Sequence, residues 1–217
     1  MEAVERAYEY RDWITLLFIL CFTLLVIAKS LYPQRFQEFI SLLTSGKFIS
    51  FKGKENRAFH PFNILMLFFQ SIVVSIFIYI IYSYYFEMES SPLVTFIRII
   101  TAVICFVLIK TGIEKIVANI FELDEKIDYY LFQKFSYRSF ISVLLFIGSL
   151  LLIYTLRPNT LILSIFGMIM LLGNAIAIFL IYKRYQLQLI QNWFYFILYL
   201  CALEIAPYYI LFKVITK

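Results

Sequence analysis

Charged side chains are scarce in this chain: they make up 15% of its 217 residues, whereas hydrophobic residues make up 63%. The mean hydropathy of +0.86 lies above the range of soluble domains. A soluble fold would have to hide apolar runs of about 20 residues inside a small core. The low charge content therefore excludes an ordinary soluble domain and predicts a polytopic α-helical membrane protein.

Histidine and the common catalytic motifs are also lacking. His60 is the single histidine, and no HExxH, GxSxG, P-loop, paired CxxC or GxGxxG sequence occurs. A histidine metal site needs further ligands, so we expect neither a bound metal nor a cofactor. His60 precedes Pro61 at the start of an apolar run, and we expect it to cap that helix or to lie at headgroup level. Enzyme activity is therefore disfavoured.

Three cysteines are present, and each lies alone in a different apolar segment, at positions Cys21, Cys105 and Cys201. This spacing does not fit a zinc site and argues against a disulfide framework. We expect these cysteines to pack as small residues in lipid or between helices.

Six apolar segments are long enough to cross a bilayer as helices. They are residues 13–32, 62–86, 93–110, 140–156, 161–182 and 193–212. We therefore predict an all-α fold, a transmembrane helical bundle in which residues 1–217 form one membrane domain. An apolar stripe at helical spacing continues past Lys110, so we expect the third helix to run on out of the membrane or along its surface.

Basic residues gather in the loops that follow the first, third and fifth segments, which indicates that these loops are cytoplasmic. They are Arg35, Lys47, Lys52, Lys54, Arg57, Lys115, Lys126, Lys134, Arg138, Lys183 and Arg184. Both termini then face outward. The net charge of +5 is interpreted as an orientation signal and an attraction to anionic lipid, rather than as a sign of nucleic-acid binding.

The first of these loops has a helical pattern of its own. Pro33 suits the first position of a helix, and apolar residues follow at helical spacing. They are Phe36, Phe39, Ile40 and Leu43. We predict a short helix in the plane of the interface, and a docking helix for a protein partner is the alternative.

An acidic residue interrupts the last apolar segment. Glu204 lies near the middle of residues 193–212, and Pro207 follows one turn later. A carboxylate at that depth costs about 3 kcal/mol or more unless it is paired, protonated or hydrated. Pro207 removes a backbone donor, so we expect the helix to bend there. We interpret this segment as the functional centre.

Arg98 is the leading candidate partner of Glu204. By chain direction, Glu204 lies roughly 18 Å from the inner surface and Arg98 roughly 7–8 Å from the outer one, at a rise of about 1.5 Å per residue. Two long side chains can bridge the difference. Asn174 and Gln70 are hydrogen-bonding alternatives, and Arg98 can instead extend to the headgroups. These residues form the predicted intramembrane polar site.

Small residues occur together in the segment 161–182, where they would let another helix approach closely. They are Gly167, Gly173, Asn174, Ala175 and Ala177. This pattern predicts a lateral contact with another helix, in this chain or in a partner.

Four stretches together resemble an uncharacterised family of Bacteroidota integral membrane proteins with an LEIAP-like final helix. They are RDW at Arg11–Trp13, HPFN at His60–Asn63, GIEKIVANIF from Gly112, and LYLCALEIAP from Leu198 to Pro207. The resemblance covers most of the chain and implies a location in a bacterial inner membrane, with both termini periplasmic. It implies no activity, and the link to that phylum's secretion or gliding machinery is by association only.

Three functions are weighed on these observations. The first is a non-enzymatic inner-membrane scaffold or assembly component of a cell-envelope complex, whose partners are the lipid bilayer and other membrane proteins or a second copy. The second is a small transporter or proton-coupled channel subunit that uses Glu204, which requires a hydrated path to that carboxylate. The third is a membrane-embedded lipid-modifying enzyme, which requires several polar groups in one pocket.

Overall fold

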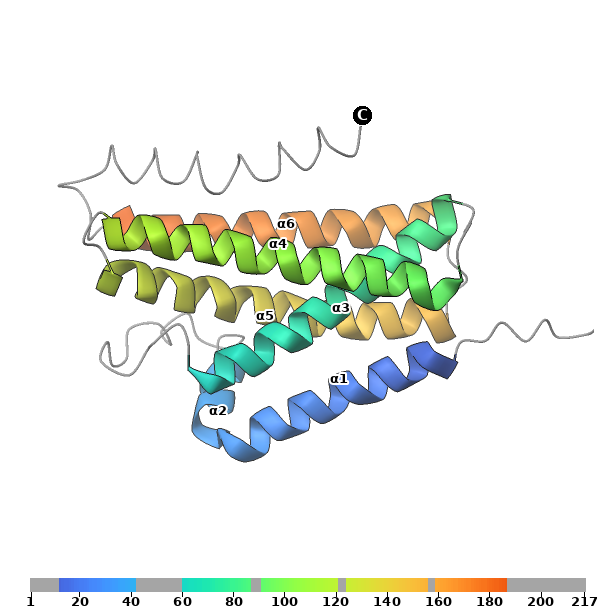
Figure 1. Ribbon diagram of the computed structural model, residues 1–217, viewed down its shortest axis with the longest axis horizontal. Coiled ribbons are helices and arrows are strands. Elements are labelled where there is room, and N and C mark those ends of the chain that lie inside the picture. Colours follow the sequence, from blue (N-terminus) through green and yellow to red (C-terminus); the bar gives the residue numbers. More distant parts are fainter. Residues whose placement is uncertain (1–11, 42–59, 87–90, 121–123, 156–158, 187–217) are drawn as a thin grey trace, which may run out of the picture.

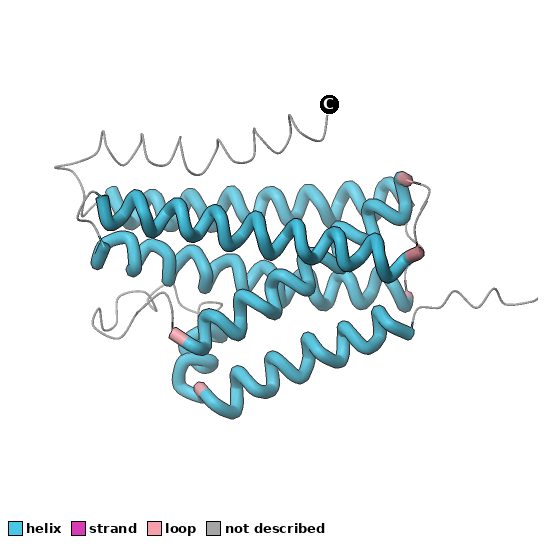
Figure 2. Tube along the Cα trace, viewed as in Figure 1, coloured by secondary structure: helices cyan, strands magenta, loops and turns pink. Residues whose placement is uncertain are grey.

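The computed structural model describes residues 12–41, 60–86, 91–120, 124–155 and 159–186 (Figure 1). Every element in these ranges is a helix, as Figure 2 shows. They are α1 (Asp12–Leu31), α2 (Pro33–Ser41), α3 (Pro61–Tyr85), α4 (Pro92–Ile120), α5 (Asp124–Tyr154) and α6 (Thr160–Gln186). The all-α prediction is therefore confirmed for the described residues.

Four of these helices are long and apolar enough to cross a membrane: α1, α3, the Pro92–Ile116 part of α4 and the Lys134–Tyr154 part of α5. The fifth predicted segment lies within α6, whose fully described part contains the apolar stretch Thr160–Ile176. The sixth predicted segment, residues 193–212, lies outside the described residues. The fold class and the order of the described helices agree with those predicted from the sequence. The count of six spans stays a prediction.

The helix boundaries differ most where charged residues flank an apolar run. α4 continues to Ile120, which confirms the helical stripe beyond Lys110. α5 begins at Asp124 rather than near residue 140. A span predicted from hydropathy begins where the charged residues end. A helix is held by backbone hydrogen bonds, so it can continue through charged residues.

The start of α3 shows the predicted cap. Pro61 occupies the first turn, and Nδ1 of His60 accepts a hydrogen bond from the backbone N–H of Phe62 at 3.2 Å. The imidazole also packs edge-on against Tyr32, which follows α1. The capping role expected of His60 is thus confirmed.

Successive long helices run in opposite directions, so the connections gather at two ends of the bundle (Figure 1). One end, called the basic end below, is where α1, α4 and α6 finish and α3 and α5 begin. At the opposite end, Tyr84 bonds Thr160 across 2.9 Å and Thr15 bonds Tyr154 across 2.6 Å. These pairs join α3 to α6 and α1 to α5.

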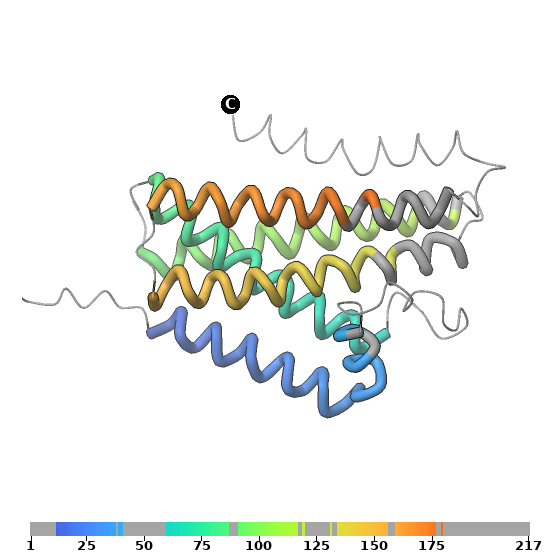
Figure 3. Tube along the Cα trace, turned by 180° about the vertical axis from the view of Figure 1, so that it is seen from behind, coloured from blue at the N-terminus to red at the C-terminus, as the bar shows by residue number. Residues whose placement is uncertain are grey.

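Helix α3 lies at the centre of the bundle. It packs against α5, α4 and α1, and 56% of its apolar stretch is buried, compared with 11% in α4. Phe69 of α3 and Phe146 of α5 are in ring contact within the main core. The view from behind shows α6 lying along α5 (Figure 3). Helices α1 and α6 therefore form the two edges of the described bundle.

Aromatic residues near the opposite end join three helices. The ring of Trp13 lies 5.2 Å from the rings of Tyr79 and Phe96, so α1, α3 and α4 meet there. These ring contacts contribute to interhelical packing at this end of the bundle.

The predicted short helix is present as α2, but part of its apolar face packs on protein. Phe39 is buried with Ala28, Phe62 and Met66. Ile40 is exposed, and Leu43 lies outside the described residues. Helix α2 therefore ties the end of α1 to the start of α3, and its place in the membrane interface stays a prediction.

The close approach between α5 and α6 occurs at Gly148 rather than at the glycines predicted for this role. A Cβ at Gly148 would lie 2.5 Å from Cε1 of Phe166, whereas Gly167 has open space around its Cα. Gly173 faces Ile141 of α5 at ordinary contact distance. Only a hydrogen at position 148 leaves room for the Phe166 ring.

We expect Gly148→Ala to lower the thermal stability of the purified protein, because the methyl group must displace the Phe166 ring; overpacking of this kind costs about 1–3 kcal/mol. Gly112→Ala is the matched control, since nothing lies within 4 Å of a Cβ there. Thermal unfolding in detergent measures both variants. Equal midpoints would contradict the close packing of α5 on α6.

Candidate functional site

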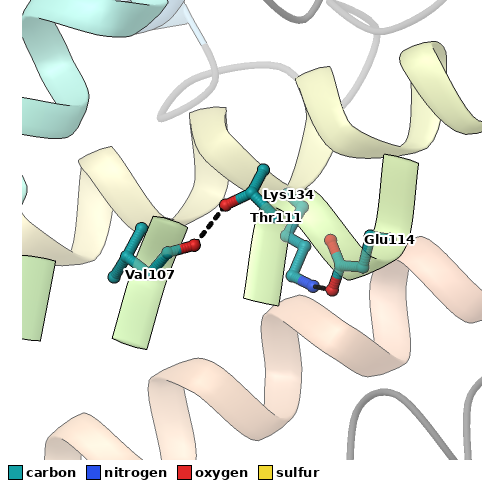
Figure 4. Close-up of polar contacts among 4 residues, drawn as sticks. All are labelled: Val107, Thr111, Glu114 and Lys134. Carbon is teal, nitrogen blue, oxygen red and sulfur yellow. Dashed lines mark hydrogen bonds and ion pairs between the residues drawn. The ribbon is translucent and has the colours of Figure 1, made fainter. Parts of the chain in front are cut away.

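Two charged side chains meet inside the bundle near its basic end. Nζ of Lys134 on α5 lies 2.5 Å from Oε1 of Glu114 on α4, and the two side chains are 6% and 2% exposed. Figure 4 shows them pointing toward each other from the two helices. Glu114 is among the most deeply buried large side chains described. A buried pair of this kind is costly to desolvate, so its position needs an explanation.

The pair lies toward one end of the two helices. Glu114 lies roughly 33 Å along α4 from Pro92, at a rise of about 1.5 Å per residue. Lys134 lies ten residues after Asp124, where α5 begins. The pair therefore lies near the basic end of both helices.

Further basic residues lie close to the pair along the same two helices. Lys110 lies one turn before Glu114 on the same face of α4 and is 5% exposed. Arg138 lies one turn after Lys134 on α5 and is half-buried, as is Lys115. The hydroxyl of Thr111 donates to the carbonyl of Val107 in its own helix, so it is directed away from the ion pair (Figure 4).

Sequence reasoning missed this site. It placed Lys110 at a membrane edge and Lys134 in a cytoplasmic loop, and it did not weigh Glu114. The sequence feature that could have indicated the site is the i, i+4 spacing of Lys110 and Glu114 within a continuing apolar stripe. The partner on α5 was not predictable, because its helix was expected to begin near residue 140.

The predicted intramembrane residues lie apart from this site where they are described. Arg98 is exposed on α4, and no carboxylate of the described residues pairs with it. Asn174 is half-buried and donates to the carbonyl of Met170 at 2.9 Å, within its own helix. Gln70 is half-buried on α3. Glu204 and Pro207 lie outside the described residues, so the Arg98–Glu204 pair stays a prediction.

The four helices of membrane-spanning length and composition indicate a helical membrane protein. A family model described as "Domain of unknown function (DUF4271)" matches residues 14–215, and the chain belongs to that family. This confirms the resemblance to an uncharacterised family. The chain matches no curated protein and no solved structure.

The ion pair can be tested by a double-mutant cycle. We expect Glu114→Leu to destabilise the protein by about 3–5 kcal/mol, because Lys134 keeps its buried charge without this carboxylate. We expect Glu114→Leu combined with Lys134→Met to recover most of the loss, since no charge of the pair remains. Unfolding of the parent, both single variants and the double variant provides the coupling energy. Additive effects of the two substitutions would show that the interaction between Glu114 and Lys134 contributes nothing to the free energy of unfolding.

Proposed function

We propose that this protein is a non-enzymatic scaffold or assembly component of a cell-envelope complex, which binds another membrane protein through the free face of α6. The observation that carries the proposal is the exposure of that face. Leu171 is 75% exposed and Met168 is 65% exposed, the highest values among large apolar residues of this helix together with Leu161. Helix α6 packs chiefly on α5, so most of its surface has no described neighbour.

Small residues on the same helix favour a protein partner over lipid alone. Gly167 has open space beside it, and Ser164 and Ala175 are exposed. Because lipid tails are as apolar as leucine, helices in membranes associate through close packing, which small residues permit. The predicted small-residue contact thus has two sides: Gly173 faces α5, and Gly167 faces outward.

The polar residues within the spans support a structural role rather than transport. Ser71, Ser75, Thr101, Ser142 and Asn174 each donate to the carbonyl four residues earlier, at 2.7–2.9 Å. Side chains bonded to their own helix do not offer successive binding positions to an ion or a proton.

The basic end supports an orientation. Lys110, Lys115 and Lys134 lie at this end, together with the loop 42–59. Basic segments of this length stay on the cytoplasmic side. We therefore propose an inner-membrane protein whose basic end is cytoplasmic and whose two termini are periplasmic.

Purification in mild detergent tests the scaffold. We expect the parent to retain a stoichiometric membrane protein, and we expect Leu171→Trp with Met168→Trp to lose it, because the indoles prevent close helix contact. Leu16→Trp on α1 is the control, because Leu16 is similarly exposed at 66%. Mass spectrometry of the eluates measures retention.

The same variants separate a partner from the chain itself. Loss of the partner with an unchanged thermal midpoint supports the proposal. A lowered thermal midpoint with the partner retained would instead indicate that residues 193–212 of the same chain pack against the α6 face. If the parent protein purifies without a stoichiometric partner, the scaffold proposal is contradicted.

Reporter fusions test the orientation. We expect alkaline phosphatase to be active when fused after Glu89 and inactive when fused after Lys52, since the enzyme matures only outside the cytoplasm. A fluorescent protein that folds only in the cytoplasm should give the reverse pattern at the same two positions. Activity of phosphatase after Lys52 would invert the proposed topology.

A further inference from the structure

We propose that residues 193–212 of this chain pack along the outer face of α4, with Glu204 against Arg98. Helix α4 packs on α3 and α5, yet only 11% of its apolar stretch is buried, the lowest share among the four described spans. Exposed residues recur at helical spacing along the rest of its surface: Ile97, Thr101, Cys105, Leu108, Gly112 and Ile116. Among the described residues, this whole face of α4 has no helix packed over it.

Two features of the α4 face suit a helix with a carboxylate better than lipid. Arg98 is exposed on it, roughly 9 Å along the helix from Pro92 at a rise of about 1.5 Å per residue, and no acidic residue of the described ranges pairs with it. A cation within an apolar stretch is stabilised by an opposite charge. Ala102, Cys105 and Gly112 follow on the same face, and small residues let another helix approach closely.

Residues 193–212 have the required composition and can reach this face. Glu204 is their single charged residue. Helix α6 ends at Gln186 at the basic end, where α4 also ends (Figure 1). Because α4 and α6 both pack on α5, and packed helix axes lie 8–10 Å apart, their axes are at most about 20 Å from each other. Residues 187–192 span about 20 Å when extended. The segment can therefore run antiparallel to α4.

One antiparallel register satisfies two pairings at once. When Glu204 lies level with Arg98, Cys201 lies level with Thr101, one turn from Cys105 on the same face of α4. Cys201 and Glu204 are three residues apart, so they share one face of the segment. Helical side chains tilt toward the N-terminus of their own helix, so the two cysteines would incline toward each other. The register that pairs the charges thus brings two thiols within reach of a short cross-linker.

This placement is independent of the partner proposed for α6. It leaves the exposed side chains of Met168 and Leu171 open to a separate protein. It also engages Glu204 in an ion pair, so that carboxylate would hold the segment on the bundle rather than carry protons. The outer face of α4 and the free face of α6 therefore have different occupants.

The native cysteines test the placement in the full chain, reconstituted in liposomes without any substitution. We expect a short bismaleimide to join Cys105 to Cys201 within one polypeptide, identified by peptide mass spectrometry at monomer mobility on a denaturing gel. Cys21 is fully buried and should not react. The controls are Val26→Cys on α1 and Leu172→Cys on α6, each combined with Cys105→Ser. All three positions are exposed and lie roughly 18–21 Å along their helices from the opposite end.

Neither control cysteine should join Cys201. A cross-link from Cys201 to the cysteine at position 26 or 172 would overturn the placement. A Cys105–Cys201 link found only between two chains would overturn it as well, because a second copy would then cover α4. The absence of any link in the folded parent would also contradict it.

Charge exchange tests the ion pair separately. We expect Arg98→Glu to lower the cross-linked fraction about tenfold or more, because two carboxylates then face each other, and we expect Glu204→Arg in the same chain to restore it. An unchanged cross-linked fraction in Arg98→Glu, or no recovery in the exchanged variant, would overturn the pairing of the two charges.

Discussion

In hydrocarbon, a polar group that finds no partner within the protein costs several kcal/mol, and this constraint governs where polar residues occur in the chain. Several hydroxyls in the spans bond to carbonyls of their own helix, and Asn174 does the same. The buried ion pair Glu114–Lys134 occurs near the basic end of α4 and α5. Between the two ends of the bundle, the described spans pack mainly through apolar and small residues.

The packing of the helices follows from this contrast between locally bonded polar groups and apolar contact surfaces. Because its serine hydroxyls bond within the helix, α3 can be surrounded by α1, α4 and α5 on different sides. Side chains such as Phe69 and Met66 then fill the centre with almost no exposure. The edge helices keep apolar surface that suits lipid or another helix. Within the described residues, the bundle thus combines an apolar interior with exposed apolar side chains on its edge helices.

The sequence predicted the class of fold, the order of the helices and the cap at His60, because each depends on local chemistry. Long apolar runs specify spans, and a histidine before Pro61 offers an acceptor where backbone donors are free. The central position of α3 was not predictable, since hydropathy does not distinguish a buried span from a lipid-facing one. Gly148 was missed for a related reason: close packing depends on which residue the neighbouring helix places opposite it. The ion pair joins residues 20 positions apart on two helices, and its partner became identifiable only with the true start of α5.

The contact between Tyr32 and His60, together with Phe39 against Phe62, holds the two attachment points of residues 42–59 close together. Because these contacts hold both ends of the connection in place, its length does not determine the spacing between α1 and α3. Insertions or deletions there would change what the protein displays beyond its basic end without altering how its spans pack. The packing of α1, α2 and α3 can therefore be maintained when the length of this connection changes.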